Sequence, residues 1–178
     1  MEQFFNADDQ QASLCDLSWL GGIIDGEGSI QVAKGSKKRG KVQGVHPRIT
    51  IVNTCPILID KVKTILEEYH IAFYQNTTHY EYKLPAKPLH GVLIHGYKRA
   101  TRFLELIIPY LVSKKLKACL LHDFCLMRAP HPRQPYSEDE KAVCRKIWEL
   151  NGHGTTCWEH ERASTTLRTA PEKGEDKV

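Results

Sequence analysis

Hydrophobic positions near the start of the chain recur at the spacing of one face of an α-helix. These positions are Leu14, Leu17, Leu20, Ile23 and Ile24. Asp16 or Ser18 stands near the start of the pattern, where a polar side chain commonly caps a helix. The pattern therefore predicts a first helix that ends shortly before Gly28.

After Gly28 the pattern becomes an alternation in which Ile30 and Val32 are separated by small or polar residues, which is typical of a strand. A Gly- and Lys-rich turn leads to a second strand over residues 48–52. Residues 71–82 and 91–97 predict another strand pair around the Pro-rich connection KLPAKPLH. The chain thus carries two predicted hairpins.

Helices are predicted between and after these hairpins. Pro56 begins one that ends near His70, and hydrophobic positions predict others around residues 103–108 and 116–124. A last helix near 137–150 follows the Pro-rich linker RAPHPRQPYS. This order predicts an α+β domain with one sheet face covered by helices and the other open. We expect one domain over residues 1–152 and a polar, mobile tail over 153–178.

Composition narrows the class of protein. The 178 residues are 41% hydrophobic, which suits one domain with a substantial core. The sequence has neither a run of about 18 apolar residues nor a signal-peptide pattern, so we expect no membrane partner and no secretion. Six scattered cysteines without a CxxC pair do not make a disulfide framework, and they indicate a reducing compartment.

Charge is distributed unevenly, although the formal net charge is only +4. Residues 1–16 hold four acids and no Lys or Arg. Residues 31–48 hold no acid and carry Lys34, Lys37, Lys38, Arg39, Lys41 and Arg48. This asymmetry favours a surface that faces a polyanion, with a merely solvated Lys-rich hairpin as the alternative. An open sheet face with Gln31, Arg48 and Thr50 among these basic positions suits a duplex groove.

The stretch LGGIIDGEGSI, residues 20–30, combines adjacent glycines with two carboxylates. Glycine costs about 1 kcal/mol relative to alanine inside a helix, at Gly21 and again at Gly22. Packing can recover this cost, because a helix without Cβ atoms can approach another backbone closely, so we favour a close helix crossing over a turn that the glycines merely loosen. Asp25 and Glu27 face the negative end of the helix dipole, which is unfavourable by about 0.3–1 kcal/mol per charge. One of these two carboxylates can hydrogen-bond locally at the helix end, and the other can bind a divalent cation. Taken alone, the sequence D-G-E-G forms a turn about as often as a metal site.

The residues from Leu20 to Gly28 resemble the nine-residue signature of the LAGLIDADG homing endonucleases, and a strand beginning Ser29-Ile30 follows as in that family. The resemblance implies an αββαββα unit whose antiparallel sheet forms a saddle over DNA, with appended C-terminal helices in this chain. It also implies that signature helices pack against each other across a twofold or pseudo-twofold axis.

The resemblance further implies a catalytic set of Glu27, Asn53 and Lys114. Glu27 would bind the catalytic Mg²⁺, or another divalent cation such as Mn²⁺, whereas Ca²⁺ would bind without supporting cleavage. Asp25 would serve the helix end. Asn53 would lie beside the metal at the end of the second strand, and Lys114 near the scissile phosphate, with Lys115 as the adjacent alternative.

A single copy of the signature supplies one carboxylate per chain, so cutting two strands implies a homodimer on a pseudo-palindromic target. The expected interface consists of Leu20, Gly21, Gly22, Ile24 and Asp25. The expected DNA contacts are Gln31, Lys34, Lys37, Lys38, Arg39, Lys41, His46, Arg48, Thr50, Tyr74, Asn76 and Thr78.

These inferences predict an intron-encoded, site-specific double-stranded DNA endonuclease without a small-molecule substrate. An RNA-binding intron maturase and a non-catalytic DNA-binding regulator are the alternatives, and the acid at Glu27 argues against the regulator. We expect a chloroplast, a mitochondrion or a prokaryotic cytoplasm as the location. Two Cys/His groups lack a standard zinc spacing, and buried cysteines with surface histidines explain them better. They are Cys119, His122 and Cys125, and His153, Cys157 and His160.

Overall fold

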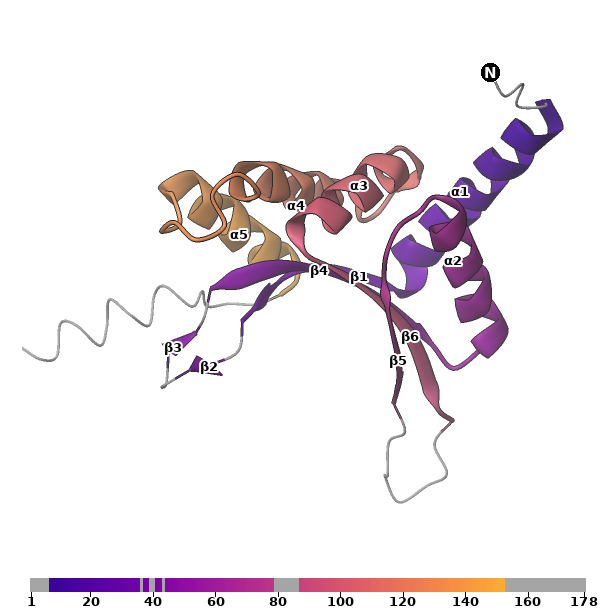
Figure 1. Cartoon of the computed structure of the whole chain (residues 1–178), viewed down its shortest axis with the longest axis horizontal. Coiled ribbons are helices and arrows are strands. Elements are labelled where there is room, and N and C mark those ends of the chain that lie inside the picture. Colours follow the sequence, from indigo (N-terminus) through magenta and orange to yellow (C-terminus); the bar gives the residue numbers. More distant parts are fainter. Residues whose placement is uncertain (1–6, 36, 39–40, 43, 79–86, 153–178) are drawn as a thin grey trace, which may run out of the picture.

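The computed structural model of the chain describes residues 7–35, 37–38, 41–42, 44–78 and 87–152 (Figure 1). Its signature unit runs α1 (Ala7–Glu27), β1 (Gly28–Lys34), β4 (Val45–Asn53), α2 (Pro56–Glu68), β5 (Tyr74–Thr78), β6 (Leu89–His95) and α3 (Tyr97–Ile107). Short strands β2 (Lys37–Lys38) and β3 (Lys41–Val42) extend the first hairpin. The 3-10 helix η1 (Ile108–Tyr110), α4 (Lys115–Arg128) and α5 (Glu138–Leu150) follow. The predicted αββαββα order with appended helices is confirmed.

The main sheet has four antiparallel strands in the order β1-β4-β6-β5. Ile30 and Val32 of β1 and Ile49 and Ile51 of β4 are buried beneath the helices. Because side chains alternate across a strand, the intervening residues lie on the opposite face. Figure 1 shows the helices on one side of the sheet and the hairpin arms extending to the other. The predicted sheet with one open face is therefore confirmed.

Helix α1 begins earlier than its hydrophobic pattern predicts. It starts at Ala7, so Asp16 and Ser18 lie inside the helix, and the prediction that either caps its start is wrong. Asp16 instead pairs with Lys61 of α2 at 2.7 Å, and the Ser18 hydroxyl donates to the Leu14 carbonyl at 2.8 Å. Among the described helices, none is long and apolar enough to cross a membrane.

The appended helices belong to the same core and hold the outer part of β1. Helix α5 begins at a capping box in which the Ser137 hydroxyl and the Glu140 side chain satisfy each other's backbone amides. At its far end the Trp148 indole donates to the Val32 carbonyl at 2.8 Å. The Asn151 side-chain amide donates to the Ile30 carbonyl at 3.3 Å. The region after residue 152 lies outside the described residues, so the predicted domain boundary and tail stay predictions.

The start of β4 is tied to the helical layer by two tyrosines, Tyr97 and Tyr136. The Tyr136 hydroxyl accepts from the Val45 amide at 2.9 Å and donates to the Val45 carbonyl at 3.1 Å. The Tyr97 hydroxyl donates to the same carbonyl at 3.0 Å. Gly44 has a φ of 84°, and a Cβ there would lie 2.7 Å from the Tyr136 oxygen. Burial, together with Tyr136, raises the pKa of Tyr97 to about 12.

We expect Tyr136→Phe to lower the free energy of unfolding by about 1–3 kcal/mol, because it leaves the half-buried Val45 amide without an acceptor. Urea denaturation measures this loss. Tyr74→Phe is the matched control, since the Tyr74 side chain is 47% exposed. Equal stability of the two variants would contradict the role of Tyr136.

Candidate functional site

The C-terminal end of α1 and the turn before α4 each bind the other's backbone through one charged side chain. Asp25 and Lys114 make this exchange of contacts. The Asp25 carboxylate accepts hydrogen bonds from the backbone amides of Val112 at 2.7 Å, Ser113 at 3.2 Å and Lys114 at 2.8 Å. It also accepts one from the Ser113 hydroxyl at 3.0 Å. In return, the Lys114 ammonium donates to the carbonyls of Ile24 at 2.8 Å, Asp25 at 2.8 Å and Gly28 at 2.7 Å.

This exchange compensates for the acids at the end of the helix, because a cation there interacts favourably with the helix dipole. Burial tends to raise the pKa of Asp25, but the hydrogen bonds from Val112, Lys114 and Ser113 outweigh it and lower that pKa overall. Burial and the nearby Lys117 lower the pKa of Lys114, while Asp25 and Glu27 oppose that change.

The structure shows what Lys114 contacts within its own chain, and its predicted place near the scissile phosphate stays a prediction. An ammonium has three donors, and those of Lys114 are directed at three backbone carbonyls. The residue therefore fixes the end of α1. The prediction that Asp25 serves the helix end agrees with its contacts, although its partners come from another segment of the chain.

Glu27 and Asn53 lie at the same edge of the sheet as this exchange. Glu27 is the exposed last residue of α1, directly before β1. Asn53 ends β4, two residues beyond the residue that pairs with Gly28. Its side-chain oxygen accepts from the Cys55 amide at 2.8 Å, which leaves the side-chain nitrogen for other contacts. The structure thus brings together the three predicted catalytic residues, whose roles stay predictions.

In the described part of the chain, no group of three or more His, Cys, Asp or Glu side chains is arranged to hold a metal ion. Cys119, His122 and Cys125 on α4 therefore form no such site. Burial raises the pKa of the Cys125 thiol to about 12, which makes it a poor thiolate ligand. His153, Cys157 and His160 lie outside the described residues.

The strand register places predicted DNA contacts on the open face of the sheet. Gln31 is opposite Arg48, which is opposite His95. Thr50 is opposite Leu93, which is opposite Tyr74. His46 precedes Arg48 by two residues and shares its face. The predictions for Gln31, His46, Arg48, Thr50 and Tyr74 are thus consistent with the register, although their contact with DNA stays a prediction.

Lys34 lies on the other face of the sheet, and its contact with DNA stays a prediction. It follows the same alternation as the buried Ile30 and Val32, and its ammonium lies 5.8 Å from the ring centre of Trp148 in α5. Several other predicted contacts are not tested. The side chains of Lys37, Lys38, Lys41, Asn76 and Thr78, and the whole of Arg39, lie outside the described residues.

Sequence reasoning missed His95 and Leu93, which share the open face. The His95 ring stacks on Tyr74, with ring centres 4.6 Å apart and planes 11° apart. Strict alternation through residues 91–97 would have identified both positions. Burial and the neighbouring His95 and Arg48 lower the pKa of His46, which favours the neutral form of its imidazole beside Arg48.

Four of the five predicted interface residues are used within their own chain. Leu20 and Ile24 have no exposed surface, and Asp25 is bound to the 112–114 turn. Gly21 is buried against η1, where a Cβ would lie 2.7 Å from the Tyr110 carbonyl oxygen. Leu20, Gly21 and Ile24 are thus covered within their own chain, and the predicted interface with a second copy stays a prediction. Only Gly22 of this set is exposed, and nothing lies within 4 Å of its Cβ position.

A helix-backed antiparallel sheet with one open face, which the end of a signature helix reaches, is the fold of homing endonucleases. The family model described as the LAGLIDADG-like domain matches residues 15–107. The chain therefore belongs to the LAGLIDADG family.

Solved structures share this fold. The homing endonuclease I-CvuI, bound to the I-CreI target in the presence of Mg, is 17% identical with a TM-score of 0.61 over 90% of this chain and 99% of that chain. I-CvuI bound to its own target in the presence of Ca is 19% identical with a TM-score of 0.63 and the same coverage. The archaeal intron-encoded I-Vdi141I bound to DNA is 14% identical, with a TM-score of 0.55 over 80% and 86% of the two chains. Comparison with curated protein sequences finds no match.

We expect Asp25→Asn to lower the free energy of unfolding by about 1–3 kcal/mol at pH 7, because its amide group replaces acceptor oxygen facing Val112 and Ser113. The pKa of Asp25 is below its ordinary value of 3.8 in the folded state, so its contribution is present above that pH and lost as the pH falls through the folded pKa. Urea denaturation at pH 7 and pH 3 should show that the difference in free energy of unfolding between wild type and variant is smaller at pH 3. Asp123→Asn, a change at a 63% exposed side chain, is the control. A gap independent of pH would contradict the assignment.

Proposed function

We propose that the protein is a site-specific double-stranded DNA endonuclease that acts as a homodimer with a divalent metal. The observation that carries this proposal is the position of Glu27, an exposed carboxylate at the edge of an open polar sheet face. Side chains on such a face can read base edges in the major groove, and the carboxylate then lies where a backbone phosphate passes.

The residues present fit a hard divalent cation. Mg²⁺ is commonly bound through one or two carboxylates together with substrate phosphate oxygens, so the lone Glu27 is a sufficient protein ligand in each chain. Mg²⁺ or Mn²⁺ would activate water and stabilise charge on the leaving oxygen, whereas Ca²⁺ would bind without supporting cleavage. Lys114 and Asp25 fix the end of α1 and thereby orient Glu27. The Asn53 side-chain nitrogen would donate to a phosphate or water at the same edge.

A second copy would pack on the exposed stripe of α1. Trp19 is 37% exposed, and nothing lies within 4 Å of the Cβ positions of Gly22 and Gly26. These glycines are four residues apart and so share one side of the helix, where the missing side chains let another backbone approach. Such a crossing would bring two copies of Glu27 together, one for each DNA strand.

The organellar or prokaryotic location stays a prediction.

Selection of cleaved sites from a random duplex library in Mg²⁺ tests the function directly. We expect a pseudo-palindrome with half-sites of about 10 base pairs, because each protomer covers about one helical turn. Intron splicing assistance without duplex cleavage would support the maturase alternative instead. Sequence-specific binding without cleavage would support the regulator.

We expect Glu27→Gln to bind the selected target about as well as wild type and to lose cleavage, because the amide keeps the size of the side chain and removes the anionic ligand. Gel-shift and cleavage assays in Mg²⁺ measure the two properties. Glu68→Gln removes an exposed acid from α2 and should cleave normally. Strand cutting by Glu27→Gln at the wild-type rate would contradict its role as a metal ligand.

The adjacent glycines should respond oppositely to leucine. Gly22→Leu should leave the protomer as stable or up to about 1 kcal/mol more stable, because leucine favours the helix, but it should abolish dimer formation on DNA. Gly21→Leu should destabilise the protomer by about 1–3 kcal/mol, because its Cβ would overlap Tyr110. Sedimentation with target DNA and urea denaturation separate the two effects. A dimeric Gly22→Leu protein would rule out this face.

A further inference from the structure

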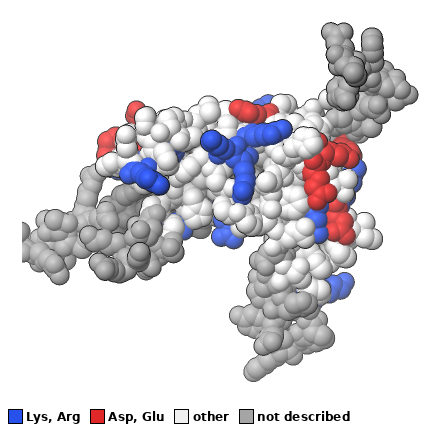
Figure 2. Space-filling model, in the orientation of Figure 1, with Lys and Arg blue, Asp and Glu red and all other residues white. Residues whose placement is uncertain are grey.

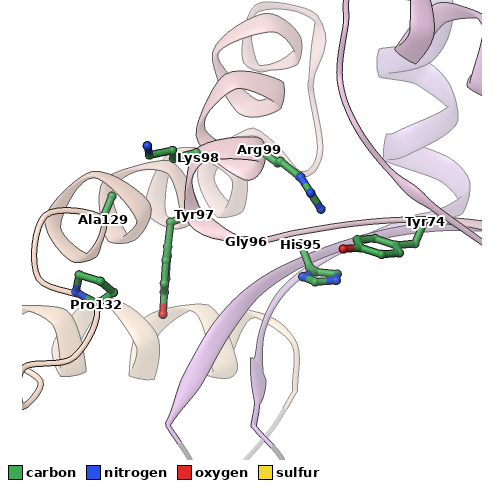
Figure 3. A pocket seen from close by; sticks show the side chains of 8 residues that line it. All are labelled: Tyr74, His95, Gly96, Tyr97, Lys98, Arg99, Ala129 and Pro132. Carbon is green, nitrogen blue, oxygen red and sulfur yellow. The ribbon is translucent and has the colours of Figure 1, made fainter.

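A pocket of about 470 Å³ lies beside the open sheet face, where β6 passes into α3. Tyr74 and His95 form one side, Lys98 and Arg99 line it from the first turn of α3, and Tyr97 and Pro132 lie opposite (Figure 3). Because Tyr74 and His95 also belong to the open face, the pocket is continuous with the surface proposed to hold DNA.

The charge of the pocket has one sign. None of the described residues that line it is acidic, and α3 has no acidic residue in its first turn. Lys98 and Arg99 instead lie at the positive end of the helix dipole, an unfavourable position for cations unless an anion is bound nearby. Figure 2 shows basic side chains gathered over α3, and acidic side chains gathered over α2.

Arg99 rests on a prearranged aromatic support. The Arg99 guanidinium lies 5.3 Å from the ring centre of Tyr74, and that ring is stacked on His95. Tyr97 is anchored by the bond from its hydroxyl to the Val45 carbonyl, so this wall is also fixed. A guanidinium that rests on an aromatic ring keeps its N–H donors for an oxyanion, which phosphate geometry suits.

We propose that this pocket binds a backbone phosphate of the DNA duplex lying on the open face, through Arg99 and Lys98. This rests on the proposed function, because it extends the DNA-facing surface beyond the sheet and onto α3. Phosphate contacts set the position of a duplex and carry no direct base information. The pocket therefore fixes how the DNA crosses the sheet edge, while the strands read the sequence.

Arg99→Gln and Lys98→Gln, singly and together, test this proposal. Dissociation constants would be measured over a salt series on the target and on a random duplex. Loss of each phosphate contact should reduce the slope of log affinity against log salt by about 0.9, equally for both duplexes. Arg102→Gln is the matched control, because it removes the same charge from an exposed position on the same helix. Thermal melts establish that the variants fold.

Equal salt slopes for Arg99→Gln and Arg102→Gln would overturn the pocket while leaving the proposed function intact. Weakened binding to the target alone would overturn it as well, because that result indicates base readout. A free phosphate compound could bind the pocket through the same contacts as a DNA phosphate, and equilibrium dialysis with inorganic phosphate tests this. If the wild-type protein binds phosphate with a submillimolar dissociation constant and Arg99→Gln abolishes that binding without changing DNA affinity, the pocket would be assigned to a small phosphate compound. Failure of the wild-type protein to bind any duplex would instead overturn the proposed function.

Discussion

The exchange of contacts between Asp25 and Lys114 determines where the Glu27 carboxylate lies. An acid near a helix C-terminus is electrostatically unfavourable, and here Lys114 from a distant turn compensates by binding two carbonyls of α1 and the Gly28 carbonyl that follows. The turn is ordered in return by the carboxylate that accepts its amides. Since α1 passes directly into β1, the same contacts set the position of Glu27 and the first residue of the open sheet.

The first hairpin is held at both ends, which makes its open face a defined surface. The Lys114 ammonium binds the Gly28 carbonyl where β1 begins, and Tyr136 binds both backbone groups of Val45 where β4 begins. Between these two ends, the Trp148 indole donates a hydrogen bond to the Val32 carbonyl of β1. The appended helices therefore support the sheet rather than forming a separate unit, and their side chains fix the register on which base readout would depend.

The sequence predicted the element order and the open face because periodicity reports which side of a helix or strand is buried. It could not identify tertiary partners: Asp25 meets a turn 87–89 residues away, and no local pattern announces that contact. Lys34 belongs to a run of basic residues, but its alternation with Ile30 and Val32 places it on the helix side of the sheet. His95 is an isolated basic residue within a strand, so no run of charge indicates it.

The two adjacent glycines show why a signature can be recognised before its physical meaning is known. Neighbouring helix positions point about 100° apart, so one partner cannot require both residues. Gly21 admits the backbone of Tyr110 within the chain, and Gly22 leaves a bare surface that Gly26 continues. One glycine thus serves the fold of the protomer and the other is available to an external helix. Both positions are glycine in the sequence, so the sequence alone does not distinguish packing within the chain from an exposed surface. The contacts in the structure make that distinction.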